Sequence, residues 1–190
     1  MPLSLILVRG FVTDAAGLEV AGHWQAVWRV SEVYLTVYMS MMTLYFMPRI
    51  SELTNAKDLA SEVVRTTLIM TVMVAFTALV IYLSRDMVVD VLYTPMFRPM
   101  RDLFAYQLIG DILRMAVWCF GFVLVAKDYH KWYVLLEILT PAIFVLSTTY
   151  LMGLLGVKAV PISYALAYAI NLVIVLFVLR ALISPNRLSH

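Results

Sequence analysis

The sequence has few of the residues on which metal centres and disulfide frameworks depend. Its 190 residues include one cysteine, Cys119, and three histidines that lie far apart, His23, His130 and His190. A lone cysteine excludes an internal disulfide and a cysteine metal cluster, and dispersed histidines lack the close spacing typical of zinc ligands. We therefore predict no metal site and no resident cofactor.

Charge is also scarce, and this indicates a membrane protein. Asp, Glu, Lys and Arg make up 14% of the residues and hydrophobic residues 63%, whereas a soluble domain is about a quarter charged and about half apolar. The apolar excess falls into several long uncharged runs, as in integral membrane proteins. The net charge of +2 is too small to indicate a nucleic-acid partner, so the expected surroundings are lipid.

A catalytic constellation is the third thing that the sequence lacks. No glycine-rich phosphate loop follows a strand pattern, no helix is rich in histidine, and no Ser/His/Asp set can be placed together. Catalysis would need a site built from charges at the membrane edge, so we predict that the protein is not an enzyme and has no catalytic residues.

The apolar runs predict an all-α, polytopic membrane helix bundle that forms one lobe over residues 1–190. Residues 1–12 are too few for the roughly 20 that cross the hydrocarbon layer, so we expect a partial helix there, followed by a loop over 13–22. The five full transmembrane helices are expected at about 23–48, 59–84, 99–126, 132–155 and 157–183.

The basic residues of the predicted loops favour one orientation. The loops after the second and fourth segments, with the C-terminus, contain Arg49, Lys57, Arg65, Lys127, Lys131, Arg180 and Arg187. The opposite side contains Arg85, Arg98, Arg101 and Lys158. Because lysine and arginine concentrate in cytoplasmic loops, this excess predicts a cytoplasmic C-terminus.

Ionisable residues inside the predicted helices are the candidates for function. A charge at membrane depth costs about 2.5–3.5 kcal/mol on insertion scales, so it needs a reason to be there. The residues concerned are Arg9, Arg29, Glu32, Asp111, Arg114 and Glu137. Arg29 and Glu32 are spaced i, i+3 and can neutralise each other, and Glu137 lies close enough to the predicted helix start to be interfacial.

The stretch from Phe97 to Arg114 carries the most informative pattern. Gln107, Asp111 and Arg114 are spaced i, i+4, i+7, so they share one helix face. One interpretation is a structural ion pair between Asp111 and Arg114. The other is a hydrated cavity in which Arg114 binds a phosphate while Asp111 orients Arg114 or exchanges a proton. With Arg29 and Glu32, these three are our candidate substrate-binding residues.

Aromatic residues and glycines have simpler interpretations. Five aromatic residues along the segment 23–48 are typical of an interfacial belt, although facing a cavity they could stack on sugars. They are Trp24, Trp28, Tyr34, Tyr38 and Tyr45. Gly110 and Gly121 are expected to allow close helix packing rather than to act as hinges.

Three stretches resemble a known family. They are Gly22–Ala26 with Ser31 and Glu32, Tyr45–Ser51, and Phe97–Asp111, which reads FRPMRDLFAYQLIGD. They resemble the Wzx-type flippases for lipid-linked oligosaccharides, in the superfamily that also contains the MATE exporters. The resemblance is greatest to the lipid III (enterobacterial common antigen) and O-antigen branch, and it extends to about Ile183.

The resemblance implies a fold, a substrate and a partner. Such flippases have two six-helix lobes, and this chain resembles the C-terminal lobe, beginning inside its first helix. It would therefore work with an N-terminal lobe in a bacterial inner membrane. The implied substrate is an undecaprenyl-diphosphate-linked oligosaccharide, moved by alternating access through a cationic cavity. The resemblance implies that charged residues line this cavity, and by their positions we expect these to be Arg29, Asp111 and Arg114.

Three alternatives remain open from the sequence. The chain could be a small exporter that works as a homodimer of this lobe. It could be a membrane-embedded glycan polymerase or ligase, although its outer loops are short for such an enzyme. It could also be a non-functional remnant of a split gene.

Overall fold

The computed structural model describes residues 2–182, in which every regular element is a helix and no strand occurs. The elements are α1 (Pro2–Ala16), α2 (Leu18–Met41), η1 (Met42–Phe46), α3 (Met47–Glu52), α4 (Ala56–Leu83), α5 (Arg85–Leu92), η2 (Pro95–Leu103), α6 (Phe104–Ala126), α7 (His130–Leu155), η3 (Gly156–Lys158) and α8 (Ala159–Leu182). The expected all-α class is therefore confirmed.

The loop expected over residues 13–22 was wrong. Helix α1 continues to Ala16 and α2 begins at Leu18, so only Gly17 interrupts them, with φ at 91°. Alanine, leucine and glutamate are strong helix formers, and the polar composition of this segment does not outweigh them. Glycine adopts positive φ without steric cost, which explains why the chain turns there.

The helical stretch that begins with α2 is longer than the predicted segment 23–48, because α2 leads directly into two further helical pieces and the stretch ends at Glu52. A π-helical turn, η1, joins it to α3, which ends at Glu52. Pro48 lies in the first turn of α3, where a missing N–H is tolerated. Asn55 then caps α4, since its side chain accepts a hydrogen bond from the Lys57 backbone N–H at 3.0 Å.

The approach to α6 is a 3₁₀ helix rather than an α-helix. Pro95 and Pro99 both lie in η2, where the missing N–H groups oppose α-helical bonding. Two exposed ion pairs, Arg98–Asp90 at 3.5 Å and Arg101–Asp86 at 2.8 Å, link η2 to α5. Exposed pairs contribute about 0–1 kcal/mol each, so packing rather than charge holds this corner.

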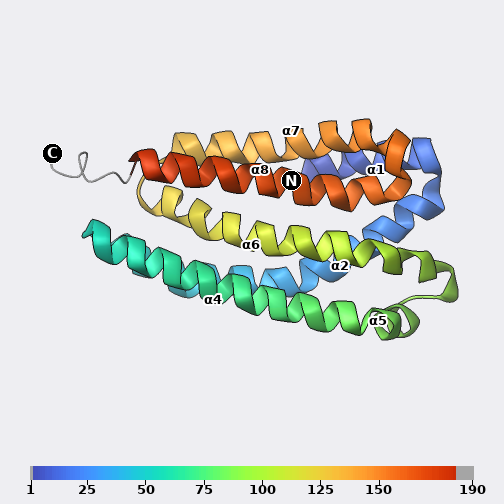
Figure 1. The fold of residues 1–190 in the computed structure, drawn as a ribbon, viewed down its shortest axis with the longest axis horizontal. Coiled ribbons are helices and arrows are strands. Elements are labelled where there is room, and N and C mark those ends of the chain that lie inside the picture. The colour runs from blue at the N-terminus through green and yellow to red at the C-terminus, as the bar shows by residue number, and fades with distance from the viewer. Residues whose placement is uncertain (1, 183–190) are drawn as a thin grey trace.

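Helix α6 lies at the centre of the bundle. It packs against α8 and α4 and also contacts α2, and in Figure 1 it runs between the α7–α8 pair and α4. At Gly110 the backbones of α6 and α8 come close together, since an added Cβ would lie 2.3 Å from a ring carbon of Tyr164. The packing role expected for Gly110 is therefore confirmed, whereas a Cβ at Gly121 would meet Tyr133 at an ordinary 3.6 Å.

Two apolar clusters fill the bundle along its length. The first includes Trp24, Trp28, Phe104, Leu108, Phe144 and Tyr164, and the second includes Leu35, Met42, Phe46, Met115, Cys119 and Val123. On α6 the two clusters overlap, because Leu108 and Val117 belong to the first and Met115 and Cys119 to the second. Asp111 and Arg114 lie between Leu108 and Met115, so the buried charges occupy the region where the two apolar clusters meet.

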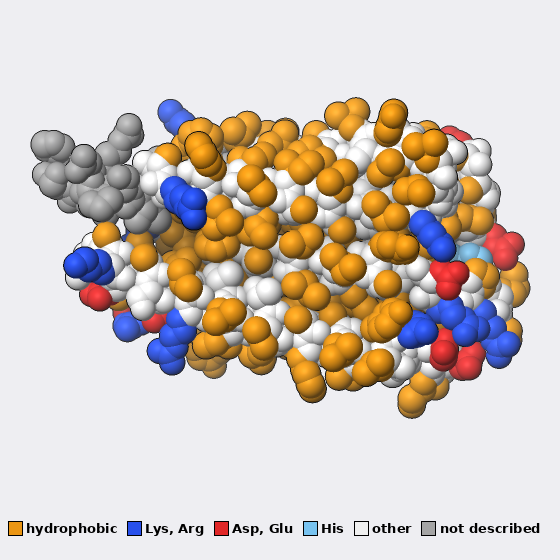
Figure 2. Space-filling model, viewed as in Figure 1, with side chains coloured by type: hydrophobic (Ala, Val, Ile, Leu, Met, Phe, Trp, Pro, Cys, Tyr) orange, Lys and Arg blue, Asp and Glu red, His pale blue; other side chains and the backbone are white. Residues whose placement is uncertain are grey.

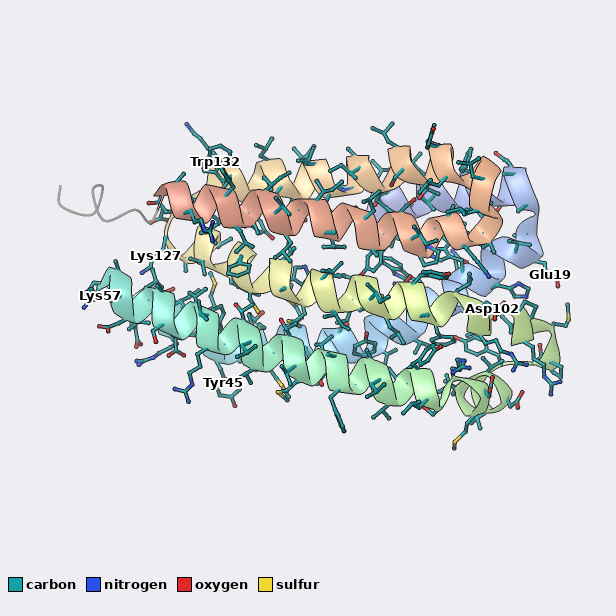
Figure 3. The ribbon with its side chains drawn as sticks, in the orientation of Figure 1. Glu19, Tyr45, Lys57, Asp102, Lys127 and Trp132 are labelled. Atoms are coloured by element: carbon teal, nitrogen blue, oxygen red, sulfur yellow. The ribbon has the colours of Figure 1, made fainter. Side chains whose placement is uncertain are left out.

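The outer surface agrees with a membrane environment. Three helical stretches of the described residues are long and apolar enough to cross a membrane: Ala56–Leu83, Pro95–Ala126 and His130–Ala181, the last of which contains both α7 and most of α8. Figure 2 shows hydrophobic side chains along the length of the visible face and charged side chains gathered at its two ends. In Figure 3, Lys57 and Lys127 lie at one end and Glu19 and Asp102 at the other.

Candidate functional site

The polar face of α6 is buried inside the bundle. Gln107 and Asp111 have no exposed surface and Arg114 is 6% exposed. Asp111 and Arg114 bond side chains of α2 and α8, and Gln107 bonds Asp111, so the predicted spacing places all three on the side of α6 that meets those two helices. The sequence pattern therefore identified a real polar cluster.

Asp111 accepts hydrogen bonds from three side chains. Its Oδ2 accepts from the Tyr34 hydroxyl at 2.7 Å, and its Oδ1 accepts from the Tyr164 hydroxyl at 2.9 Å and from Gln107 Nε2 at 3.4 Å. A buried carboxylate is stabilised when donors surround it. These bonds tie α2 and α8 to α6 through one carboxylate.

Arg114 pairs with α2 rather than with its neighbour on α6. Its Nη1 donates to Glu32 Oε1 at 2.6 Å and to the Tyr164 hydroxyl at 3.4 Å. No ion pair joins Arg114 to Asp111 within residues 2–182, so the self-contained Asp111–Arg114 pair was the wrong interpretation. The Arg29–Glu32 pair was wrong as well, because Glu32 faces Arg114 instead.

Two tryptophans flank the guanidinium of Arg114. Its Cζ lies 4.3 Å from the ring centroid of Trp118 and 5.7 Å from that of Trp28. A cation over an aromatic face is stabilised by about 0.5–2 kcal/mol, depending on how far it is desolvated. The Arg114 Nε remains buried with no hydrogen-bond partner among the described residues, so the guanidinium has an unused donor.

A cavity of about 540 Å³ opens beside this arginine. Arg114 and Trp118 form its α6 side. The opposite side, made by α2 and η1, presents four polar residues: Glu32, Thr36, Ser40 and Thr43. A second cavity of about 370 Å³ shares Met39, Thr43 and Trp118 with the first and extends between α6, α7 and α8. The two cavities therefore lie side by side, and Arg114 lines the larger one.

The five candidate residues lie at three different places relative to the larger cavity. Glu32 and Arg114 line the larger cavity, and Gln107 and Asp111 lie behind it. Arg29 is exposed and does not line that cavity, although its charge acts on Tyr93. The site as folded is thus a cavity-lining ion pair supported by a buried carboxylate.

Several aromatic side chains of the site were not identified from the sequence. No sequence pattern pointed to Tyr164, because its partner Arg114 lies 50 residues away in the sequence. No pattern pointed to Trp118 either, although it lies on the same helix as Arg114 and its ring contacts that guanidinium. Trp24 and Trp28 are 1% and 7% exposed, so the interfacial-belt interpretation was wrong for them. A buried charge predicts aromatic or polar neighbours, but it does not say which residues supply them.

The groups that line the larger cavity can bind a polar ligand. Within the described residues no group of three or more His, Cys, Asp or Glu side chains could hold a metal ion. The cavity instead offers one guanidinium, one carboxylate, several hydroxyls and an indole ring. These groups suit a ligand that carries phosphate and hydroxyl groups.

Known proteins resemble the chain in sequence. No family model matches it. The proteins named Lipid III flippase of Escherichia coli (strain K12) and of Shigella flexneri are each 32% identical to it over 138 residues. The match covers 73% of this chain and 33% of each relative, so it spans about a third of the relatives' length.

The fold has a counterpart among solved structures. The crystal structure of the Vibrio cholerae MATE transporter VcmN in the bent form matches with a TM-score of 0.78 at 16% identity. The match covers 95% of this chain and 42% of that chain. These similar proteins are flippases and a transporter rather than enzymes. The resemblance indicated by the sequence is thus confirmed: the chain is a membrane helix bundle with the fold of part of a MATE transporter, and it is similar to part of a lipid III flippase.

Proposed function

We propose that this chain is the C-terminal lobe of a flippase that moves an undecaprenyl-diphosphate-linked oligosaccharide across a bacterial inner membrane. The proposal is supported by the similarity to proteins named Lipid III flippase, by the MATE-type fold and by the apolar surface. The glycan would serve surface polysaccharides such as enterobacterial common antigen or O-antigen. The partner would be an N-terminal lobe, in the same protein or in a separate chain.

The observation that carries this proposal is the buried arginine in the cavity wall. Arg114 is 6% exposed, lines a cavity of about 540 Å³ and keeps its Nε free of partners. A guanidinium binds phosphate through two parallel hydrogen bonds, and a low-dielectric wall strengthens them. The diphosphate head group of the substrate would bind here, while its prenyl tail stays in lipid.

The arrangement of the lobe follows from the same proposal. Five full transmembrane helices and one partial helix would surround the midplane charges, as in transporters built from repeats. The end that carries Lys57 and Lys127 would face the cytoplasm. The C-terminus is proposed to lie on the cytoplasmic side as well. Rocking of the two lobes would expose Arg114 to each side of the membrane in turn.

The test is glycan export in a flippase-deficient strain that expresses both lobes. Arg114→Gln removes the cation and should reduce surface glycan about 10- to 100-fold, because a charge-assisted contact contributes about 1.5–3 kcal/mol. The matched control is Arg101→Gln, which removes an arginine from an exposed ion pair far from the cavity. Export by Arg114→Gln at the control level would refute the proposed site, and export by this lobe alone would replace the two-lobe proposal with a homodimeric exporter.

A further inference from the structure

The ion pair in the cavity wall joins two unequal partners. The Arg114 side chain is 7% exposed and the Glu32 side chain 42% exposed, so the arginine is fixed and the glutamate reaches it from the cavity side. Among the described residues, the Glu32 carboxylate accepts a side-chain hydrogen bond from Arg114 Nη1 alone. Its carboxylate therefore takes the position from which a phosphate in the cavity would reach the same guanidinium.

The charges around Arg114 do not by themselves favour an incoming anion. The network contains two carboxylates, Asp111 and Glu32, against one guanidinium. Asp111 is fully buried and held by three donors, so it stays in place when a ligand arrives. Glu32 has no second hydrogen bond to its carboxylate among the residues described, so it is the member that can leave.

We propose that Glu32 is an internal counter-ion that holds Arg114 while the site is empty and is displaced by the phosphate of the substrate. This inference rests on the proposed function of the Arg114 site. A tethered carboxylate competes at a high effective concentration, so weak anions do not occupy the site. A diphosphate displaces it because it carries more negative charge and more acceptor oxygens than one carboxylate. The Nε of the same guanidinium is a further donor without a partner among the described residues.

The same competition gives the substrate a way to leave. When the cavity opens to the other side, the Glu32 carboxylate can return to Nη1 and replace the departing phosphate. Removing Glu32 should therefore strengthen binding and slow release together. This distinguishes Glu32 from a residue that binds the substrate, whose removal would weaken binding.

The experiment measures anion binding to the purified chain in detergent by isothermal titration calorimetry. Inorganic pyrophosphate and inorganic phosphate are the probes, and the variants are Glu32→Gln and Glu32→Asp. Both anions should bind Glu32→Gln about five- to tenfold more tightly than the unmodified chain. Glu32→Asp keeps the charge but shortens the side chain, so it should give an intermediate gain.

The ratio of the two affinities separates competition from long-range charge. Pure competition raises both affinities by the same factor, whereas removing a nearby negative charge favours the more highly charged pyrophosphate. Glu52→Gln is the matched control, because it removes an exposed carboxylate at the end of α3 and should leave both affinities unchanged. A gain confined to pyrophosphate, or the same gain in Glu52→Gln, would overturn the inference.

The remaining outcomes separate this inference from the proposed function. If Arg114→Gln loses pyrophosphate binding while both Glu32 variants bind like the unmodified chain, the counter-ion is refuted and the Arg114 site stands. If Arg114→Gln binds pyrophosphate normally, or if neither the unmodified chain nor Glu32→Gln binds it, the site itself fails. Circular dichroism confirms that each variant keeps its helices, and Glu32→Asp decides the case if Glu32→Gln does not fold.

Discussion

Replacing Gly110 with alanine should disrupt the site although it removes none of the polar groups of the site. A Cβ at this position would lie 2.3 and 2.5 Å from two ring carbons of Tyr164 and 3.3 Å from the Ala165 backbone nitrogen. Carbon atoms pack at about 3.5–4.0 Å, so the ring must move by more than about 1 Å. It has little room, because the rings of Trp28 and Tyr168 lie 4.9 and 5.0 Å away between centroids.

Three contributions determine how Gly110→Ala changes the free energy of unfolding, two of them destabilising and one stabilising. Overpacking a filled core costs about 1–3 kcal/mol. A displaced Tyr164 ring also loses the hydroxyl bond to the Asp111 carboxylate, and a hydrogen bond to a charged group contributes about 1.5–3 kcal/mol. The gain in helix propensity from glycine to alanine returns about 1 kcal/mol. We therefore expect the free energy of unfolding to fall by about 1.5–5 kcal/mol.

The chain supplies its own probe for this measurement. Cys119 is its single cysteine and has no exposed surface, so a thiol-reactive fluorogenic dye reports unfolding during heating in detergent. Gly121→Ala is the matched control on the same helix, since its Cβ would meet Tyr133 at 3.6 Å and should leave stability equal or slightly higher. Combining Gly110→Ala with Tyr164→Leu should recover part of the loss.

Equal melting midpoints for Gly110→Ala and Gly121→Ala would refute this reasoning. The close approach of α6 and α8 would then not limit the position of Tyr164. A loss in Gly110→Ala that Tyr164→Leu fails to relieve would place the clash at the α8 backbone instead of the ring.

Three further predictions test two hydrogen bonds and the burial of one side chain. Tyr164→Phe keeps the ring but removes its hydroxyl, so it should lower the free energy of unfolding by about 1–3 kcal/mol in the same thermal assay. Lys127→Ala removes the donor to the Leu53 carbonyl at 2.5 Å and should cost about 0.5–1.5 kcal/mol, whereas the exposed Lys131→Ala should cost nothing measurable. Cys119 should resist alkylation in the native chain and react fully in denaturant, and labelling at equal rates would contradict its burial.

The helices and the polar face of α6 could be predicted from the sequence because both are local patterns. Long uncharged runs cannot satisfy their backbone groups in lipid except as helices. The spacing of Gln107, Asp111 and Arg114 fixes a common face on any helix that contains them. Both predictions depend on residues within one segment.

The partners of these residues could not be predicted because they are set by packing between helices. Arg114 has an acid three residues before it, yet it pairs with Glu32, which lies 82 residues away. Asp111 bonds Tyr34 and Tyr164, which lie 77 residues before it and 53 after it. A single sequence shows which side chains need partners, but only the docking of α2 and α8 on α6 decides which ones they find.

The placement of Asp111 limits how the proposed transporter can work. Its carboxylate holds Tyr34 of α2 and Tyr164 of α8, and it has no exposed surface, so water reaches it only if those bonds open. Opening them would leave an unpaired charge between two apolar cores, at a cost of several kcal/mol. Asp111 therefore joins α2, α6 and α8 through its hydrogen bonds. If the lobe moves as a unit, the part of the site free to respond to a ligand is the exposed Glu32 side chain, and exchange at Arg114 must take place there.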